Sequence, residues 1–350
     1  MQGNARAWVK VLAVAVAHAA VAGCAGGGAP LGPGAAGPPG GAAAASAVVA
    51  RIPLRTFGTG IAIAPDGSRA LVATSAELVA LDVPARSAAG TIEVGNVPYG
   101  VALSPDGGRG YAVDLLQQLV WFLDLRSQTV ARKLWLGSPG QAVLRPGIAV
   151  SPDGTRVYAT VSAPTGQAED SLRVFDAASG NESRRSFDFH PGQLAATRDG
   201  RRLWITGCHG FCSDGIVHVL DAATLAKVGE VALPSVPGGI AVAADGGRGW
   251  VANGLAGSVS VVDASSGAVA ANVPVGAEPL GVALSPDGTR VWVTCFAAGT
   301  LVGIDAATGA VVAQIPVGEA PRAIALTPDG RYAWLTHSTP IVSVVDLSRG

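Results

Sequence analysis

The chain has 350 residues, of which 14% are charged and 5% are aromatic, and its formal net charge at pH 7 is -1. This balance excludes a basic face that would neutralise nucleic-acid phosphates, and it excludes a polybasic segment that would hold the chain on an anionic membrane. The 48 glycines and 23 prolines suit many short strands and turns better than long helices. We therefore expect an all-β protein that does not bind nucleic acid.

Residues 1–23 have the features of a secretory signal peptide. Arg6 and Lys10 form a positive segment, and residues 11–23 form a 13-residue apolar run that is too short to span a bilayer. The run ends in Val-Ala-Gly followed by Cys24, which resembles the bacterial lipobox, whose cysteine becomes the lipidated first residue of a mature lipoprotein. An ordinary signal peptide with an unmodified Cys24 is the alternative. The pattern predicts an exported, lipid-anchored protein of the bacterial cell envelope, periplasmic or on the outer surface.

Residues 24–46 are almost purely glycine, alanine and proline. Such a segment cannot bury a hydrophobic core, so we expect a flexible tether. The folded domain should then span residues 47–350, and its contact with the membrane should be through the lipid anchor alone.

A hairpin signal returns seven times after residue 46. In each case an Asp-Gly pair separates two stretches of alternating apolar residues, as a tight turn between half-buried antiparallel strands requires. Successive turns lie 40 to 47 residues apart, which is the period of propeller blades, and each unit reads as four strands. The sequence predicts a seven-bladed β-propeller in which these aspartates stabilise turns. They are Asp66, Asp106, Asp153, Asp199, Asp245, Asp287 and Asp329.

The seventh unit lacks its fourth strand. Residues 47–53 read AVVARIP and match residues 310–316, AVVAQIP, at all but one position. Because residues 310–316 are the predicted fourth strand of the sixth unit, we expect residues 47–53 to join the last blade. This pairing would close the ring and remove the open sheet edges that invite aggregation.

The segment from Trp250 to Asn253, with the strand at 258–263, and the segment from Trp292 to Cys295 resemble the repeat of the YVTN family of propellers. That family is related to surface-layer, lactonase-like and cytochrome d1-like propellers. The resemblance covers residues 47–350 and implies the fold more strongly than a function, because its members include binding proteins, surface proteins and some enzymes. The repeat has asparagine at the end of the second strand, and this chain keeps only Asn253. The other units have Ser75, Asp114, Val161, Gly207, Cys295 and His337.

One face of the ring is the place to seek a site. The loops between second and third strands, and those between successive blades, emerge where the central funnel opens, and such clefts hold ligands. Each polar side chain there has a solvated or turn-stabilising role as its alternative. The candidates are Tyr99, Asp114, Arg145, Asp170, His190, His209, Asp214, Asn253, Glu278, Cys295, Glu319, Arg322 and His337.

Residues 208–212 read Cys-His-Gly-Phe-Cys and interrupt the repeat. In an exported protein, two cysteines at this spacing predict a local disulfide between Cys208 and Cys212. The spacing differs from the Cys-x-x-Cys-His of covalent haem attachment. A soft metal held by Cys208, His209 and Cys212 is one alternative, and a metal between Cys295 and His337, which occupy equivalent positions in neighbouring blades, is another. The expected cofactor is none.

The chain contains no Gly-x-Ser-x-Gly, His-Glu-x-x-His or Gly-x-x-x-x-Gly-Lys motif, so the common hydrolase, zinc protease and nucleotide-binding signals are absent from the sequence. We expect a monomeric, non-enzymatic binding or scaffold module that takes an envelope protein, a peptide or a cell-wall glycan at its funnel face. The resemblance also implies two alternatives. One is a lactonase-like hydrolase using His190, His337, Glu278 and Glu319, and the other is a metal or redox accessory protein.

Overall fold

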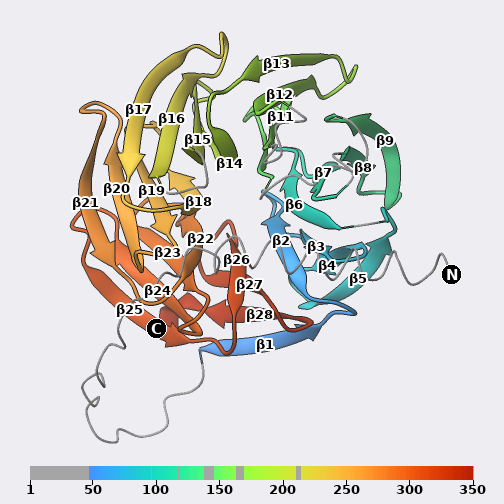
Figure 1. Ribbon diagram of the computed structural model, residues 1–350. Helices are drawn as coiled ribbons and strands as arrows, with labels where there is room; N and C mark the ends of the chain where they lie inside the picture. Colours follow the sequence, from blue (N-terminus) through green and yellow to red (C-terminus); the bar gives the residue numbers. More distant parts are fainter. Residues whose placement is uncertain are drawn as a thin grey trace, which may run out of the picture.

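The computed structural model describes residues 47–95, 97–116, 119–137, 146–162, 169–209 and 214–349. These residues form seven four-stranded antiparallel sheets arranged as blades around a common centre (Figure 1). The predicted all-β, seven-bladed propeller is therefore confirmed. The signal peptide, Cys24 and the tether lie outside the described residues and remain predictions. Within the described ranges, no helix is long and apolar enough to cross a membrane.

In each blade the first strand is innermost and the fourth is outermost. Blade 1 contains β2 (Gly58–Ile63), β3 (Arg69–Thr74), β4 (Leu78–Asp82) and β5 (Ser87–Ile92); blade 2 contains β6 (Pro98–Leu103), β7 (Arg109–Asp114), β8 (Leu119–Asp124) and β9 (Thr129–Trp135). Blade 3 contains β10 (Ile148–Val150), β11 (Arg156–Val161), β12 (Ser171–Asp176) and β13 (Glu182–Ser186); blade 4 contains β14 (His190–Ala196), β15 (Arg202–His209), β16 (Asp214–Asp221) and β17 (Lys227–Leu233). Blade 5 contains β18 (Pro237–Val242), β19 (Arg248–Asn253), β20 (Ser258–Asp263) and β21 (Ala268–Pro274); blade 6 contains β22 (Pro279–Leu284), β23 (Arg290–Cys295), β24 (Thr300–Asp305) and β25 (Val311–Pro316). Blade 7 contains β26 (Pro321–Leu326), β27 (Tyr332–His337), β28 (Ile341–Asp346) and, from the other end of the domain, β1 (Val48–Pro53); a short 3-10 helix, η1 (Leu347–Arg349), follows β28.

Strand β1 closes the ring by pairing antiparallel with β28. Ile52 lies opposite Val342 in this register, and its side chain is only 3% exposed. The backbone N–H of Leu54 extends the contact by donating to the carbonyl of Pro340 at 2.8 Å. The predicted closure by residues 47–53 is thus present, and it joins segments nearly 300 residues apart in the sequence (Figure 1).

The hydrophobic core is divided among the interfaces between blades. Between blades 5 and 6, for example, Trp250 and Val261 pack with Val291 and Cys295. Between blades 7 and 1, Ile52 of the closing strand packs in one cluster with Trp334. Because each sheet buries both faces against its neighbours, every blade depends on the next one for its stability.

Arginines at the start of the second strands fasten neighbouring blades together. In four blades the guanidinium donates a hydrogen bond to a backbone carbonyl in the turn between the third and fourth strands of the next blade. Blade 7 has Tyr332 at this position, and Arg86 from blade 1 lies over its ring, with 4.7 Å between the guanidinium carbon and the ring centroid. Between blades 7 and 1 a cation–π contact therefore takes the place of the arginine–carbonyl hydrogen bond. The four hydrogen bonds are Arg69 to Leu125 (2.8 Å), Arg109 to Ala177 (3.1 Å), Arg156 to Ala222 (2.9 Å) and Arg248 to Ala306 (3.1 Å).

The repeated aspartates stabilise turns, as their spacing predicts. Asp153 accepts hydrogen bonds from the Ser151 hydroxyl at 2.5 Å and from the Thr155 backbone N–H at 3.0 Å, and these donors lower the pKa of its carboxyl group. The glycine that follows, Gly154, has a φ of 72°, a left-handed conformation that side chains disfavour. The Asp-Gly pair is therefore explained by turn geometry.

Candidate binding site in the central channel

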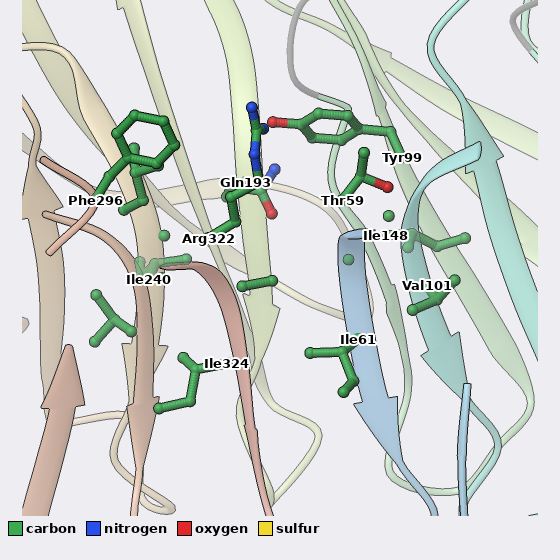
Figure 2. A pocket seen from close by; sticks show the side chains of 18 of the residues that line it. Thr59, Ile61, Tyr99, Val101, Ile148, Gln193, Ile240, Phe296, Arg322 and Ile324 are labelled. Carbon is green, nitrogen blue, oxygen red and sulfur yellow. The ribbon is translucent and has the colours of Figure 1, made fainter. Parts of the chain in front are cut away.

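A cavity of about 240 Å³ lies at the centre of the ring, and the inner strands of all seven blades line it (Figure 2). Each strand contributes an aliphatic side chain at the position five residues before the aspartate of its turn. Together these side chains make an apolar collar around the channel. They are Ile61, Val101, Ile148, Leu194, Ile240, Val282 and Ile324.

The inner strands approach each other so closely that the preceding position favours glycine. A Cβ atom on Gly60 would lie 2.5 Å from the carbonyl oxygen of Tyr99, and one on Gly281 would lie 2.6 Å from that of Arg322. The hydroxyl of Thr294 donates to the same Arg322 carbonyl at 2.6 Å. These contacts fix the backbone of Tyr99 and Arg322, which both stand seven residues before the turn aspartate of their blade. The two residues line the cavity.

Arg322 is oriented by contacts on several sides. Its Nε donates to the Ser338 hydroxyl at 2.9 Å, and its guanidinium carbon lies 5.6 Å from the ring centroid of Phe296 and 5.7 Å from that of Phe57. Both ring distances are within the range of cation–π attraction. In Figure 2 the guanidinium points toward the same part of the cavity as the Tyr99 hydroxyl and the Gln193 amide.

Two further cavity residues have structural roles that their contacts explain. The Thr59 hydroxyl lies within hydrogen-bonding distance of the carbonyls of Ala73 (3.1 Å) and Pro98 (2.9 Å). Glu278 has a φ of 57°, and its carbonyl accepts the Phe296 N–H at 2.9 Å. Ala320 has the same conformation in the next blade connection, with a φ of 49°, and it does not line the cavity. The positive φ of Glu278 therefore belongs to the connection, while its carboxylate is the one acid among the described lining residues.

The residues that end the second strands face the loops instead of the cavity. Asp114, Asn253, Cys295 and His337 are each 0% exposed, and none lines the cavity. The Asp114 carboxylate accepts hydrogen bonds from the backbone N–H of Val97 at 3.0 Å and from that of Leu116 at 2.6 Å. The Asn253 amide donates to the Ser260 hydroxyl at 2.8 Å. In blade 1 the prediction of Ser75 for this position is wrong. The equivalent residue is Thr74, because Thr74 pairs with Gly58 in the way that Asp114 pairs with Pro98 in blade 2.

Cys295 and His337 contact different blade connections. The Cys295 thiol donates to the Val275 carbonyl at 3.3 Å, and burial raises its pKa to about 11. His337 Nδ1 lies 2.9 Å from the Glu319 carbonyl, and burial lowers the pKa of this imidazole. The partner of Cys295 therefore lies between blades 5 and 6, and that of His337 lies between blades 6 and 7. Across the described residues, no three His, Cys, Asp or Glu side chains form a group that could hold a metal.

The other described candidates do not line the cavity. His190 Nδ1 and Asp170 Oδ2 lie 2.9 Å apart, with side chains 23% and 17% exposed, outside the cavity lining. His209 and Asp214 are exposed and face each other across β15 and β16, and Glu319 is also exposed. Arg145 lies outside the described residues.

Cys208 is disulfide-bonded, and its side chain is 6% exposed. Cys212 lies outside the described residues, so the pairing of these two cysteines remains a prediction. Cys208 and His209 do not line the cavity.

Sequence reasoning identified Tyr99, Glu278 and Arg322, but it missed Phe57, Gln193 and Phe296. One signal was available for Gln193, which stands six residues before its turn aspartate, where five of the seven units have glycine. Counting back from each aspartate would have singled it out as a side chain at a close approach of strands.

Comparisons with known proteins support the fold without selecting a function. No family model matches the sequence, and no curated protein matches it. The structure is similar to hydrazine synthase from Kuenenia stuttgartiensis, with a TM-score of 0.75 and 18% sequence identity over 85% of this chain and 97% of that one. At that identity the likeness concerns the fold alone. In total 1724 chains of solved structures match, so the architecture is shared too widely to indicate an activity. The likeness to the YVTN family remains a prediction.

Proposed function

We propose that the protein is a binding module that takes its ligand into the mouth of the central channel. The observation that carries this proposal is the composition of the cavity, in which an aliphatic collar meets a few polar side chains at one end. Ligand sites are mostly apolar with a small number of placed polar groups. A volume of about 240 Å³ suits a small molecule or the terminal residue of a longer chain.

The N-terminal predictions give this module a cellular setting. A lipid on Cys24 and a tether over residues 24–46 would display the propeller at the cell envelope. Its ligand would then come from an envelope protein, a peptide or a cell-wall glycan. We propose a monomer, because the closed ring leaves each blade already paired with two neighbours.

Binding is favoured over hydrolysis by the residues at the channel. The described lining contains neither histidine nor cysteine, and Glu278 is its one carboxylate. His190 and His337, which a lactonase-like site would use, are placed outside the lining. A general acid–base pair needs both groups within hydrogen-bonding reach of one substrate.

A thermal-shift screen of the full chain with peptides, glycans and small molecules tests the proposal. Ile240→Trp would fill the channel, and Val228→Trp adds the same bulk at a position that is 56% exposed on an outer strand. We expect at least one ligand whose stabilisation is lost with Ile240→Trp and kept with Val228→Trp. Ligands that bind Ile240→Trp as well as the unmodified protein would refute a channel site.

A further inference from the structure

We infer that His218 is a proton-sensitive latch, which holds the connection between blades 3 and 4 against blade 4 at neutral pH and releases it when the imidazole is protonated. The connection comprises residues 187–189, which link β13 to β14 (Figure 1). His218 does not line the channel cavity, so the latch is separate from the proposed binding function.

His218 joins the connection to the third strand of blade 4. It lies in the middle of β16, opposite Ile205 of β15 and Glu230 of β17, and it is only 4% exposed. The ring centroid of Phe189 lies 4.3 Å from that of the imidazole, and the ring centroid of Phe187 lies 6.0 Å from it. Both phenylalanines belong to the connection, so its aromatic side chains pack directly on His218.

Only one nitrogen of the His218 imidazole has a hydrogen-bond partner in the part of the chain that the structure describes. Nε2 lies 3.2 Å from Glu230 Oε2, so the neutral tautomer that fits this contact carries its proton on Nε2 and donates it to the carboxylate. Nδ1 is buried and has no such partner. Protonation would therefore create a buried N–H without an acceptor, and this costs the desolvation free energy of the group.

The charged groups around His218 partly offset one another. Burial is the largest effect on the imidazole, and it lowers the pKa of His218 in spite of the opposing attraction of Glu230. The Glu230 side chain is 46% exposed, and its carboxylate also binds the Lys227 ammonium at 2.5 Å, which weakens that attraction. Asp188 in the connection favours protonation, whereas Lys227 and Arg185 oppose it. The folded protein therefore favours neutral His218.

Release of the connection would also affect the channel wall. Phe189 is 1% exposed and packs in the same core cluster as Leu194 of β14, the strand that follows the connection. Leu194 lines the channel cavity. The inner strand of blade 4 is therefore coupled by packing to the contact between Phe189 and His218.

The sign of the pH dependence follows from the lowered pKa of His218. The open state takes up a proton more readily than the closed state, so the closed state loses stability as the pH falls below about 6.5, the ordinary pKa of histidine. Uptake of one proton on opening raises the opening equilibrium constant by up to about tenfold between pH 7.5 and pH 5.5.

Hydrogen–deuterium exchange of the unmodified full chain at pH 7.5 and pH 5.5, read by mass spectrometry, tests the latch. Exchange times are scaled for the intrinsic amide exchange rate at each pH. We expect protection to fall by about tenfold at pH 5.5 in peptides covering residues 187–196 and 227–233. Protection should stay constant in β9, an outer strand of blade 2, because that blade contains no histidine.

Variants then assign the effect to His218. His218→Gln keeps an N–H donor for Glu230 but does not titrate, so the fall in protection should disappear. His209→Gln replaces an exposed histidine of the same blade, and the fall should remain. The pKa of His337 is also lowered by burial, but His337 is present in all three proteins, so its contribution cancels in the comparison. Circular dichroism melts at pH 7.5 establish that each variant is folded.

Three results would overturn the inference. The first is constant protection of residues 187–196 in the unmodified protein at the two pH values. The second is a fall of equal size in β9, which would indicate a general loss of stability instead of a local release. The third is a fall that survives His218→Gln. If His218→Gln did not fold, the comparison of residues 187–196 with β9 in the unmodified protein would still decide between release and general destabilisation, and His218→Asn would replace it as the variant that cannot titrate.

Discussion

Truncation of Ile52 to alanine tests whether the closing strand is part of the cooperative fold. Ile52 is 3% exposed and packs in the core between blades 7 and 1, although β1 and β28 come from opposite ends of the domain. A buried isoleucine replaced by alanine costs roughly 2–5 kcal/mol through lost transfer energy and a residual cavity. We therefore expect Ile52→Ala to lower the free energy of unfolding by about 3 kcal/mol, measured by guanidinium denaturation of the full chain.

Blade 6 provides matched controls. Ile315 occupies the equivalent position in the near-identical segment 310–316 and is 4% exposed, so Ile315→Ala should cost a similar amount. Val312, on the same strand, is 46% exposed, and Val312→Ala should change the free energy of unfolding by less than about 0.5 kcal/mol. If Ile52→Ala behaved like Val312→Ala, the closing strand would be peripheral and the argument for ring closure would be wrong.

Three other features give predictions that can be checked independently. Arg156→Ala removes a hydrogen bond to a carbonyl of the next blade and should lower the free energy of unfolding by about 1–2 kcal/mol, whereas Arg126→Ala, at an exposed turn, should be nearly neutral in the same denaturation assay. The Ser265 hydroxyl and neighbouring N–H groups lower the pKa of Asp263 to about 2, below the roughly 3.9 of an unfolded aspartate, so this stabilisation is complete above about pH 4 and is lost as the pH falls toward 2. A thermal midpoint that stayed constant between pH 4 and pH 2 would contradict it. Cys295, with its pKa raised to about 11, should resist a thiol-alkylating reagent at pH 8 until guanidinium unfolds the chain, and rapid labelling of its peptide in the native protein by mass spectrometry would show that the site is open.

Much of the fold could be predicted because its determinants are local and repeated. An Asp-Gly pair forms its turn through contacts within a few residues, as Asp153 and Gly154 do, and seven copies at a regular spacing indicate the number of blades. The pairing of β1 with β28 could also be predicted, although the two strands are far apart in the sequence. Residues 47–53 closely match the sequence of the fourth strand of blade 6. This match identified β1 as the missing fourth strand of blade 7, where it pairs with β28.

The candidate site was less predictable because it depends on which side of each strand faces the channel. The residues ending the second strands differ most from the repeat, yet Asp114 and Cys295 proved to be fully buried loop partners. The register of the inner strands also shifts between Pro279 and Val282, and again between Pro321 and Ile324. Such bulges change the side-chain alternation, so counting by twos along the sequence misplaces the residues at the channel mouth.

The sequence by itself determined the architecture, because turn chemistry and strand alternation act over short distances and are repeated in every unit. Only the tertiary structure decided that Arg322 of blade 7 meets Phe296 of blade 6 and Phe57 of the segment between β1 and β2. No periodic signal links these three residues, since each belongs to a different part of the repeat. They come together because ring closure places blades 6, 7 and 1 side by side, and the close packing of the inner strands then aims Arg322 into the channel.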